Sequence, residues 1–180
     1  MLRSSSFTLT SDAGTLRVLQ SACKVAEAFD PNAPEPHPEL KDFQAIWDTG
    51  ATNSCVTQNV IDACGLKPLS MTQVHGVGGI HLSEVYLVNI FLPNNLGVQQ
   101  VRVTRGILAT ADVLLGMDVI TLGDFAITNL NGRTVFTFCM PSHRRLDFVA
   151  EHNQAAARMN PPRGFRGYTQ PQGAKPKRHK

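Results

Sequence analysis

The feature that most restricts what this chain can fold into is an acid placed directly after an apolar run. Residues 45–55 read AIWDTGATNSC, so Asp48 ends the apolar segment and is followed by Thr49, Gly50 and Ala51. A carboxylate at the boundary of a core loses hydration, and folded proteins keep such groups where hydrogen bonds or chemistry compensate for that loss. The position of Asp48 therefore requires a specific explanation.

Three roles for Asp48 are compatible with its neighbours. It could cap a turn, because Asp accepts local backbone hydrogen bonds and Gly50 gives a permissive backbone. A metal-binding role has little support, since no second acid lies nearby at ligand spacing, the four cysteines form no CxxC pair and the six histidines no HExxH. No metal or cofactor is expected. Acid–base chemistry is the third role, and the rest of the chain decides between it and the turn cap.

The segment from Phe43 to about Met140 reads as short strands separated by turns. Alternating apolar and polar residues predict strands, and several strands at short spacing predict a barrel or a sandwich. A helix is expected over 57–65, where Thr57 can cap the start and Gly65 can end it. Trp47 is expected to pack inside its strand. The predicted strands cover residues 43–47, 81–93, 98–108 and 134–140.

Composition divides the chain into four parts. Residues 1–42 are expected to form an N-terminal extension with a Pro-rich loop, 43–140 the β-rich domain, 141–157 a C-terminal helix and 158–180 a basic disordered tail. The tail holds seven basic residues and no acid, whereas the remainder has 10 basic and 14 acidic residues, so the tail is a candidate for weak polyanion contact. No apolar run reaches the about 20 residues that span a bilayer and the N-terminus lacks a signal-type apolar region, so a cytoplasmic location and no membrane contact are expected.

Two glycine-containing segments favour the acid–base role. Residues 74–82, VHGVGGIHL, place three glycines between alternating stretches, and residues 111–120, ADVLLGMDVI, interrupt an apolar run with Gly116. An apolar strand into Asp-Thr-Gly-Ala, then a glycine-rich hairpin, then two hydrophobic residues and a glycine resembles the retropepsin-like aspartic proteases over about residues 43–140. The stretch LLGMDVITLGDFAITN is similar to the bacterial and phage-borne branch of that family.

The resemblance implies an all-β fold, a retropepsin-like acid-protease barrel with one short helix after the catalytic loop, working as a two-fold homodimer. It also implies that Thr49 bonds across the two-fold axis, that a flap covers the substrate cleft, and that a hydrophobic-hydrophobic-Gly motif lies beneath the Asp loop. The implied residues are Asp48, Thr49 and Gly50 for catalysis, Ala51, Gly76, Val77, Gly78 and Gly79 for the flap and cleft, and Leu114, Leu115 and Gly116 for support of the catalytic loop.

The chemistry of peptide hydrolysis agrees with these residue types. Hydrolysis without a metal or a nucleophilic side chain needs a base to activate water and an acid to protonate the carbonyl oxygen; two carboxylates in contact do both by sharing one proton, as aspartic-protease dyads illustrate. Asp-Thr-Gly occurs once, and Asp118 and Asp124 lack the Thr/Ser-Gly that would follow, so the second Asp48 must come from a second subunit. The sequence predicts an aspartic endopeptidase for peptide or protein substrates. The alternative is a catalytically silent retropepsin fold used for dimerisation or peptide binding.

Overall fold

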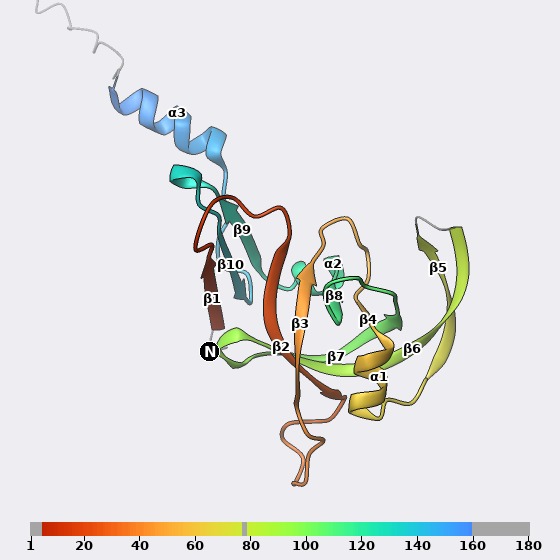
Figure 1. Cartoon of the computed structure of the whole chain (residues 1–180). Coiled ribbons are helices and arrows are strands. Elements are labelled where there is room, and N and C mark those ends of the chain that lie inside the picture. Colours follow the sequence, from red (N-terminus) through yellow and green to blue (C-terminus); the bar gives the residue numbers. More distant parts are fainter. Residues whose placement is uncertain (1–4, 77–78, 160–180) are drawn as a thin grey trace, which may run out of the picture. The chain divides into compact units, whose positions relative to one another are not determined.

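The structure, a computed structural model, describes residues 5–76 and 79–159 (Figure 1). The chain divides into two units, Met1–Arg144 and Arg145–Lys180. The second unit contains α3 (Phe148–Met159). The first unit contains β1 (Ser5–Thr10), β2 (Leu19–Glu27), β3 (Lys41–Trp47), β4 (Cys55–Val56), α1 (Gln58–Cys64), β5 (Ser70–Gly76), β6 (Gly79–Leu92), β7 (Leu96–Arg105), β8 (Val113–Leu115), α2 (Met117–Ile120), β9 (Asp124–Thr128) and β10 (Val135–Met140), with short 3-10 turns at Pro93–Asn95 and Leu130–Gly132.

Six strands of the first unit close into a barrel. Their order is β2-β3-β8-β4-β7-β6, and β6 also pairs with β2, which joins the two ends of the sheet. The pairs β3–β8 and β4–β7 are parallel, and the other pairs are antiparallel. β6 continues past the barrel as a long hairpin with β5 (Figure 1). The all-β barrel expected from the sequence is confirmed.

Alternation along the strands fills the inside of this barrel, because successive side chains of a strand point to opposite faces. In β3, Phe43, Ala45 and Trp47 are buried, while Asp42 and Gln44 are exposed. The four strands predicted from alternation correspond to β3, β6, β7 and β10. Trp47 is 6% exposed, which confirms its expected role in packing.

Residues 5–27 contribute strands to both sheets, whereas the sequence assigned residues 1–42 to an N-terminal extension. β1 pairs with β10, which pairs with β9 in a separate three-stranded sheet, and β2 lies between β3 and β6 in the barrel. Alternation did not reveal β2 clearly, because Val25 and Ala26 are neighbours and both fully buried. Residues 30–40 contain no strand or helix, in keeping with the loop that their prolines predicted.

The helix predicted over 57–65 is α1, and its two ends differ in how they are capped. Gly65 follows the last residue with φ of 62°, the left-handed conformation that glycine favours there, and its N–H donates to the carbonyl of Asp62. Thr57 holds the N-cap position, but its side chain makes no capping bond and its buried Oγ1 has no partner among the described residues. α2 was not predicted, and it begins directly after Gly116.

The second unit is described only as far as α3. This helix begins at Phe148 rather than at 141, and the Asp147 carboxylate accepts the N–H of Ala150 at 3.0 Å at its start. The basic tail from residue 160 onward lies outside the described residues. Within the described residues, no helix has the length and apolar character needed to cross a membrane. The cytoplasmic location stays a prediction.

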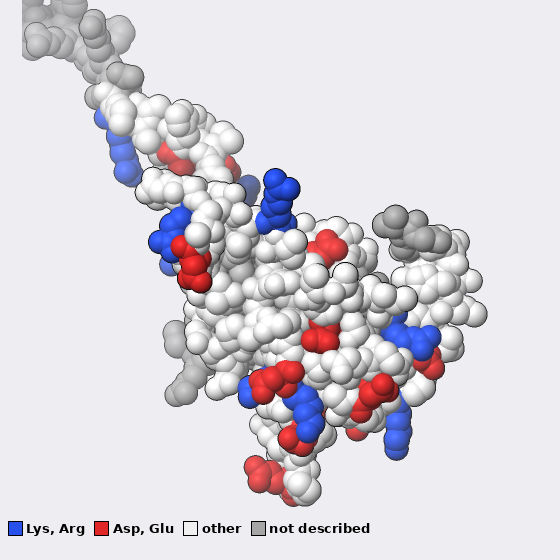
Figure 2. Space-filling view, in the orientation of Figure 1, with Lys and Arg blue, Asp and Glu red and all other residues white. Residues whose placement is uncertain are grey.

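Charged side chains are interspersed on the face of the molecule shown in Figure 2, where basic and acidic groups lie close together over the barrel. Within residues 5–76 and 79–159, three ion pairs join Lys24 to Asp42 at 3.3 Å, Lys41 to Glu39 at 2.6 Å, and Arg105 to Glu84 at 3.9 Å. Such surface pairs contribute little stability because water screens them.

Candidate active site

Asp48 lies one residue beyond β3, at the start of a tight loop. Its N–H donates to the carbonyl of Leu115 at 3.0 Å, which continues the parallel pairing of β3 with β8. Its Oδ1 accepts the N–H of Gly50 at 2.8 Å, and its carbonyl accepts the N–H of Ala51 at 3.2 Å. The carboxylate thus caps its own turn through one oxygen, while Oδ2 makes no hydrogen bond among the described residues. Asp48 is half-buried, and Thr49 and Gly50 are exposed.

The loop rests directly on the start of α2. The Met117 N–H donates to the Ala51 carbonyl at 2.8 Å, and the Asp118 N–H donates to the Thr52 carbonyl at 3.2 Å. A Cβ on Gly116 would come within 2.8 Å of the backbone of Asn53 and 2.9 Å of the carbonyl oxygen of Ala51, closer than real Cβ atoms come. Only glycine lets the two backbones approach this closely. Gly116 therefore fixes the height of the loop above the barrel.

A side-chain contact that the sequence analysis missed ties the far end of this loop to the same helix. The hydroxyl of Ser54 donates to Asp118 Oδ1 at 2.7 Å and accepts the N–H of Gly116 at 3.0 Å, and the N–H of Ser54 donates to Asp118 Oδ2 at 2.9 Å. Ser54 is fully buried. A charged acceptor with two donors from one residue is a strong, directional contact. Its two members are 64 positions apart, so no local pattern identifies them.

The glycine-rich hairpin tip is described in part. Gly76 and Gly79 are opposed at the end of the β5–β6 hairpin, and Gly79 has φ of 101°. Val77 and Gly78 lie outside the described residues. Close to the tip, Ile80 is 65% and Leu82 66% exposed. In the view of Figure 1, the end of β5, the end of β3 and α2 all lie on the upper side of the barrel.

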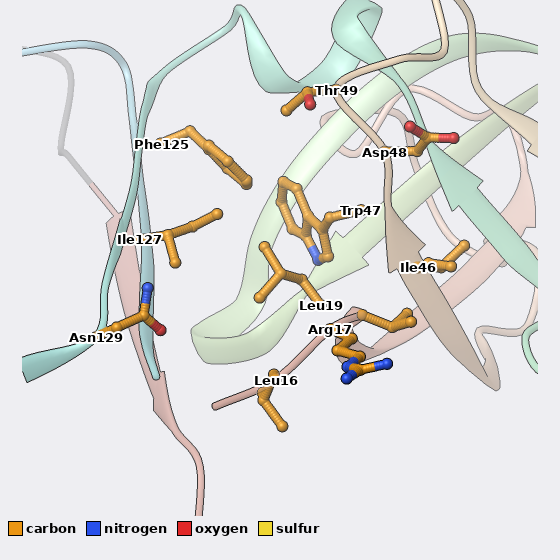
Figure 3. Close-up of a pocket in the computed structure, with 11 residues that line it drawn as sticks. Leu16, Arg17, Leu19, Ile46, Trp47, Asp48, Thr49, Phe125, Ile127 and Asn129 are labelled. Carbon is orange, nitrogen blue, oxygen red and sulfur yellow. The ribbon is translucent and has the colours of Figure 1, made fainter. Parts of the chain in front are cut away.

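A cleft of about 370 Å³ lies beside the Asp48 loop, and Asp48 and Thr49 are among its lining residues (Figure 3). Trp47 and Phe125 face each other across it, with ring centroids 5.7 Å apart, and Asp48 points away from Trp47 (Figure 3). Trp47 also packs on three phenylalanines of the second sheet and donates from Nε1 to the Ser21 hydroxyl at 3.0 Å. The lining residues are Leu16, Arg17, Val18, Leu19, Ile46, Trp47, Asp48, Thr49, Phe125, Ile127 and Asn129.

The thiol next to the loop is not prepared for nucleophilic chemistry. Burial, with the nearby Asp118 and Asp48 carboxylates adding to it, raises the pKa of Cys55 to about 11. The thiol is therefore protonated at neutral pH, and the thiolate is the nucleophilic form. Among the described residues, no group of three or more His, Cys, Asp or Glu side chains is arranged to hold a metal ion. The loop accordingly offers the chemistry of a carboxylate.

Comparison of the sequence and the structure with known proteins identifies a family that the segment around the Asp48 loop matches. Residues 39–121 match the family described as "gag-polyprotein putative aspartyl protease", and this range contains the Asp48 loop, the hairpin and Gly116. No curated protein matches the sequence significantly. Among solved structures, a retropepsin-like aspartic protease from Rickettsia conorii is similar at 10% identity with a TM-score of 0.45, covering 77% of this chain and 97% of that one. The Simian Foamy Virus (mac) protease is similar at 16% identity with a TM-score of 0.40, covering 57% of this chain and 91% of that one.

Proposed function

We propose that this chain, which belongs to the retropepsin-like aspartic protease family, is an aspartic endopeptidase whose active site forms between two Asp48 carboxylates, one from each subunit of a homodimer. The observation that carries the proposal is how the Asp48 loop is held and which atom of Asp48 it leaves accessible. The loop is fixed by backbone contacts to β8 and α2, yet one carboxylate oxygen of Asp48 is left without a partner among the described residues. This Asp48 oxygen is not buried, since Thr57 Oγ1 is the one buried side-chain oxygen or nitrogen without a partner among the described residues, and it is therefore open to contact with water or with a second carboxylate.

Each residue of the loop has a distinct part in this proposal. Asp48 supplies the reacting carboxylate, and Thr49 contacts its copy across the two-fold axis. Gly50 holds one oxygen of Asp48 through its N–H, which fixes the rotation of the carboxylate. A side chain at Gly50 would place its Cβ 3.1 Å from Asp48 Oδ1, so a larger residue would push the carboxylate away. Ala51 leaves space for the substrate main chain.

The proposed reaction uses one proton shared by the two carboxylates, because like charges in contact cannot both ionise. The ionised Asp48 takes a proton from water as the water oxygen attacks the peptide carbonyl carbon, and the protonated Asp48 gives its proton to the carbonyl oxygen. Breakdown of the resulting diol breaks the C–N bond, with a proton passing to the amine that leaves. The products are a new carboxyl terminus and a new amino terminus.

The hairpin of β5 and β6 is the proposed flap. Its apolar residues near the tip, Ile80 and Leu82, are exposed as the chain stands alone, and a bound peptide would cover them. An extended peptide can pair its main chain with such a hairpin, which gives affinity that depends little on sequence. Val77, Gly78 and the opposed pair Gly76 and Gly79 would form the part that closes over the substrate and excludes water.

Replacement of Asp48 tests the catalytic proposal. Asp48→Asn keeps the shape of the side chain but cannot share the proton, so we expect peptide cleavage to fall by at least about 10³-fold while the fold is retained. Cleavage of a diverse peptide library between pH 4 and 7 measures the effect. Asp12→Asn, at an exposed acid, is the matched control and keeps wild-type cleavage. Equal cleavage by wild type and Asp48→Asn would refute the mechanism, and cleavage by neither would favour the silent dimerisation or peptide-binding module.

A further inference from the structure

We propose that α3 (Phe148–Met159) and the basic segment after it attach this chain to an anionic lipid surface, with the helix lying along the surface and its apolar side chains inserted between the lipids (Figure 1). The partner is a membrane that carries acidic headgroups, such as those of phosphatidylserine. No residue of the Asp48 loop or of the β5–β6 hairpin takes part in this contact, so it goes beyond the catalytic proposal and is independent of it.

The large apolar side chains of α3 all lie on one face of the helix. Successive residues of an α-helix are about 100° apart, so residues 148, 149, 152, 156 and 159 fall within an arc of about 100°. These residues are Phe148, Val149, His152, Ala156 and Met159. Histidine is compatible with such a face at a boundary with water, because its ring has an apolar body and a polar edge. The helix therefore has one apolar face that runs from its first residue to its last.

The rest of the described chain leaves this face uncovered. Phe148 is 69%, Val149 71% and Met159 82% exposed, and none of the 12 residues of α3 is buried. In a globular domain, the apolar side of an amphipathic helix packs on the core. An amphipathic helix whose apolar side packs on nothing is typical of segments that bind a lipid surface or the groove of a partner.

The charge of the segment that follows α3 favours one of these partners. Residues 158–180 contain seven Lys and Arg residues and no Asp or Glu. Seven like charges on each chain repel one another, which disfavours packing of the apolar face against the α3 of a second copy. They attract a surface of acidic lipids, where each Lys or Arg near the surface raises the affinity by about five-fold.

A nucleic acid would bind the basic segment but would leave the apolar face of the helix unexplained. A helix that binds phosphates carries basic residues along one face. The polar side of α3 instead holds an acid, an amide and one base, which are Glu151, Gln154 and Arg158. A lipid surface accounts for both features, because acyl chains cover the apolar face and acidic headgroups attract the basic segment.

Attachment of this kind needs no membrane-spanning segment. The expectation of no membrane contact rested on the absence of an apolar run of about 20 residues, the length that crosses a bilayer. A helix that lies along the interface needs only an apolar face and a polar face. A short apolar face or a basic segment binds weakly when it acts alone, so stable attachment needs both. Loss of either one is therefore expected to release the chain.

Co-sedimentation of the full-length chain with lipid vesicles tests the role of α3. We expect binding to vesicles of about three parts phosphatidylcholine to one part phosphatidylserine, and at least about ten-fold weaker binding to phosphatidylcholine alone. Phe148→Ala combined with Met159→Ala removes apolar area but introduces a good helix former, and is expected to weaken binding to the mixed vesicles at least about ten-fold. Gln154→Ala, on the polar side of the same helix, is the matched control and keeps wild-type binding. Circular dichroism verifies that the helix content is unchanged.

The basic segment is tested by removing its charge while keeping its length. One variant replaces four basic residues with glutamine: Lys175→Gln, Lys177→Gln, Arg178→Gln and Lys180→Gln. Its binding to the mixed vesicles is expected to be at least about ten-fold weaker than that of the wild type. The control variant, Lys175→Arg with Lys177→Arg and Lys180→Arg, keeps every charge and is expected to keep the binding.

The outcomes separate lipid attachment from other uses of the same segment. Equal binding to both kinds of vesicle, or to neither, would overturn the proposal. So would wild-type binding by Phe148→Ala with Met159→Ala, because the helix would then have no part in it. Tighter binding to a polyuridine RNA than to the mixed vesicles would assign the basic segment to nucleic acid. Cleavage of a short soluble peptide is expected to be unchanged in all of these variants, so the catalytic proposal is tested separately by Asp48→Asn.

Discussion

At the scale of single residues, the active-site loop depends on a contact between Ser54 and Asp118. Asp118 accepts both donors of Ser54, and its neighbours Gly116 and Met117 hold the backbone of the loop. We expect Asp118→Ala to lower the free energy of unfolding by about 2–3 kcal/mol, because it leaves the donors of a buried serine unpaired. Cleavage should fall with it, since the loop that carries Asp48 loses one of its anchors.

A double-mutant cycle separates this contact from a general weakening of α2. Ser54→Ala and Asp118→Ala together should cost less than the sum of the single changes, with a coupling of about 1–3 kcal/mol, measured by urea unfolding. Thr121→Ala is the control, because the Thr121 hydroxyl bonds only within the helix turn, to the carbonyl of Met117 at 2.7 Å. Additive effects of Ser54 and Asp118 would contradict the assignment.

Local chemistry in the sequence predicts some of these residues and not others. Gly65 and Gly116 were predicted because a helix end and a close backbone approach each need glycine, whatever lies elsewhere in the chain. Ser54 and Asp118 give no such signal, since their importance comes from a pairing across 64 positions. Asp48 was identified from the residues around it in the sequence, whereas the cleft lined by Trp47 and Phe125 was identified only in the structure.

At the scale of elements, the segment that follows β10 is held by hydrogen bonds to the first residue of β9. Asp124, the first residue of β9, accepts the hydroxyl of Ser142 and the N–H groups of His143 and Arg144. These hydrogen bonds, the Ser142 hydroxyl first, hold the pKa of Asp124 below its usual value of 3.8. A lowered pKa means that the ionised form is bound better in the folded chain. The contact is therefore present above the unfolded pKa, and it is lost as the pH falls through the folded value.

The lowered pKa of Asp124 predicts a pH-dependent change that can be measured at two backbone amides. As the pH falls below about 3.8, we expect the amide proton resonances of His143 and Arg144 to move upfield together as their hydrogen bonds to the carboxylate are lost. The indole N–H of Trp47, which is bonded to Ser21, reports that the core is still folded. In Asp124→Asn the two amides should not titrate, whereas Asp147→Asn, at the cap of α3, should leave the titration unchanged. A wild-type titration that persists in Asp124→Asn would rule out Asp124 as its source.

Element prediction from the sequence succeeded where a strand is long enough to show its period. β7 alternates between buried and more exposed residues over parts of its length. β6 is long enough to be recognised as a strand, but neighbours such as Val88, Asn89 and Ile90 are buried together, so its two faces could not be read from alternation. β4 has two residues and β8 three, too few to show any period. α2 has four residues and follows Gly116, so it was read as part of an apolar strand. The short elements are the ones that carry the Asp48 loop.

At the scale of the whole molecule, closure of the barrel depends on contacts that no segment encodes alone. β2 pairs with β3 and β6, and this second pairing turns an open sheet into a ring. The family resemblance supplied the barrel in outline, but not the use of residues 5–27 within it. Residues 145–159 contribute no strand to either sheet.

The proposed assembly makes a quantitative prediction for mixed subunits. If both Asp48 carboxylates are needed, only dimers of two wild-type chains cleave, so mixing wild type with an equal amount of Asp48→Asn should leave about a quarter of the activity expected for the same total protein as wild type. An enzyme that works as a monomer would keep about half, because each wild-type chain would act independently. The mixture is assayed after subunits have exchanged at a concentration near the dissociation constant. Asp12→Asn in place of Asp48→Asn is the control and should leave activity unchanged at every ratio. Activity that follows the wild-type fraction linearly, rather than its square, would show that one Asp48 suffices and that the two-fold active site is wrong.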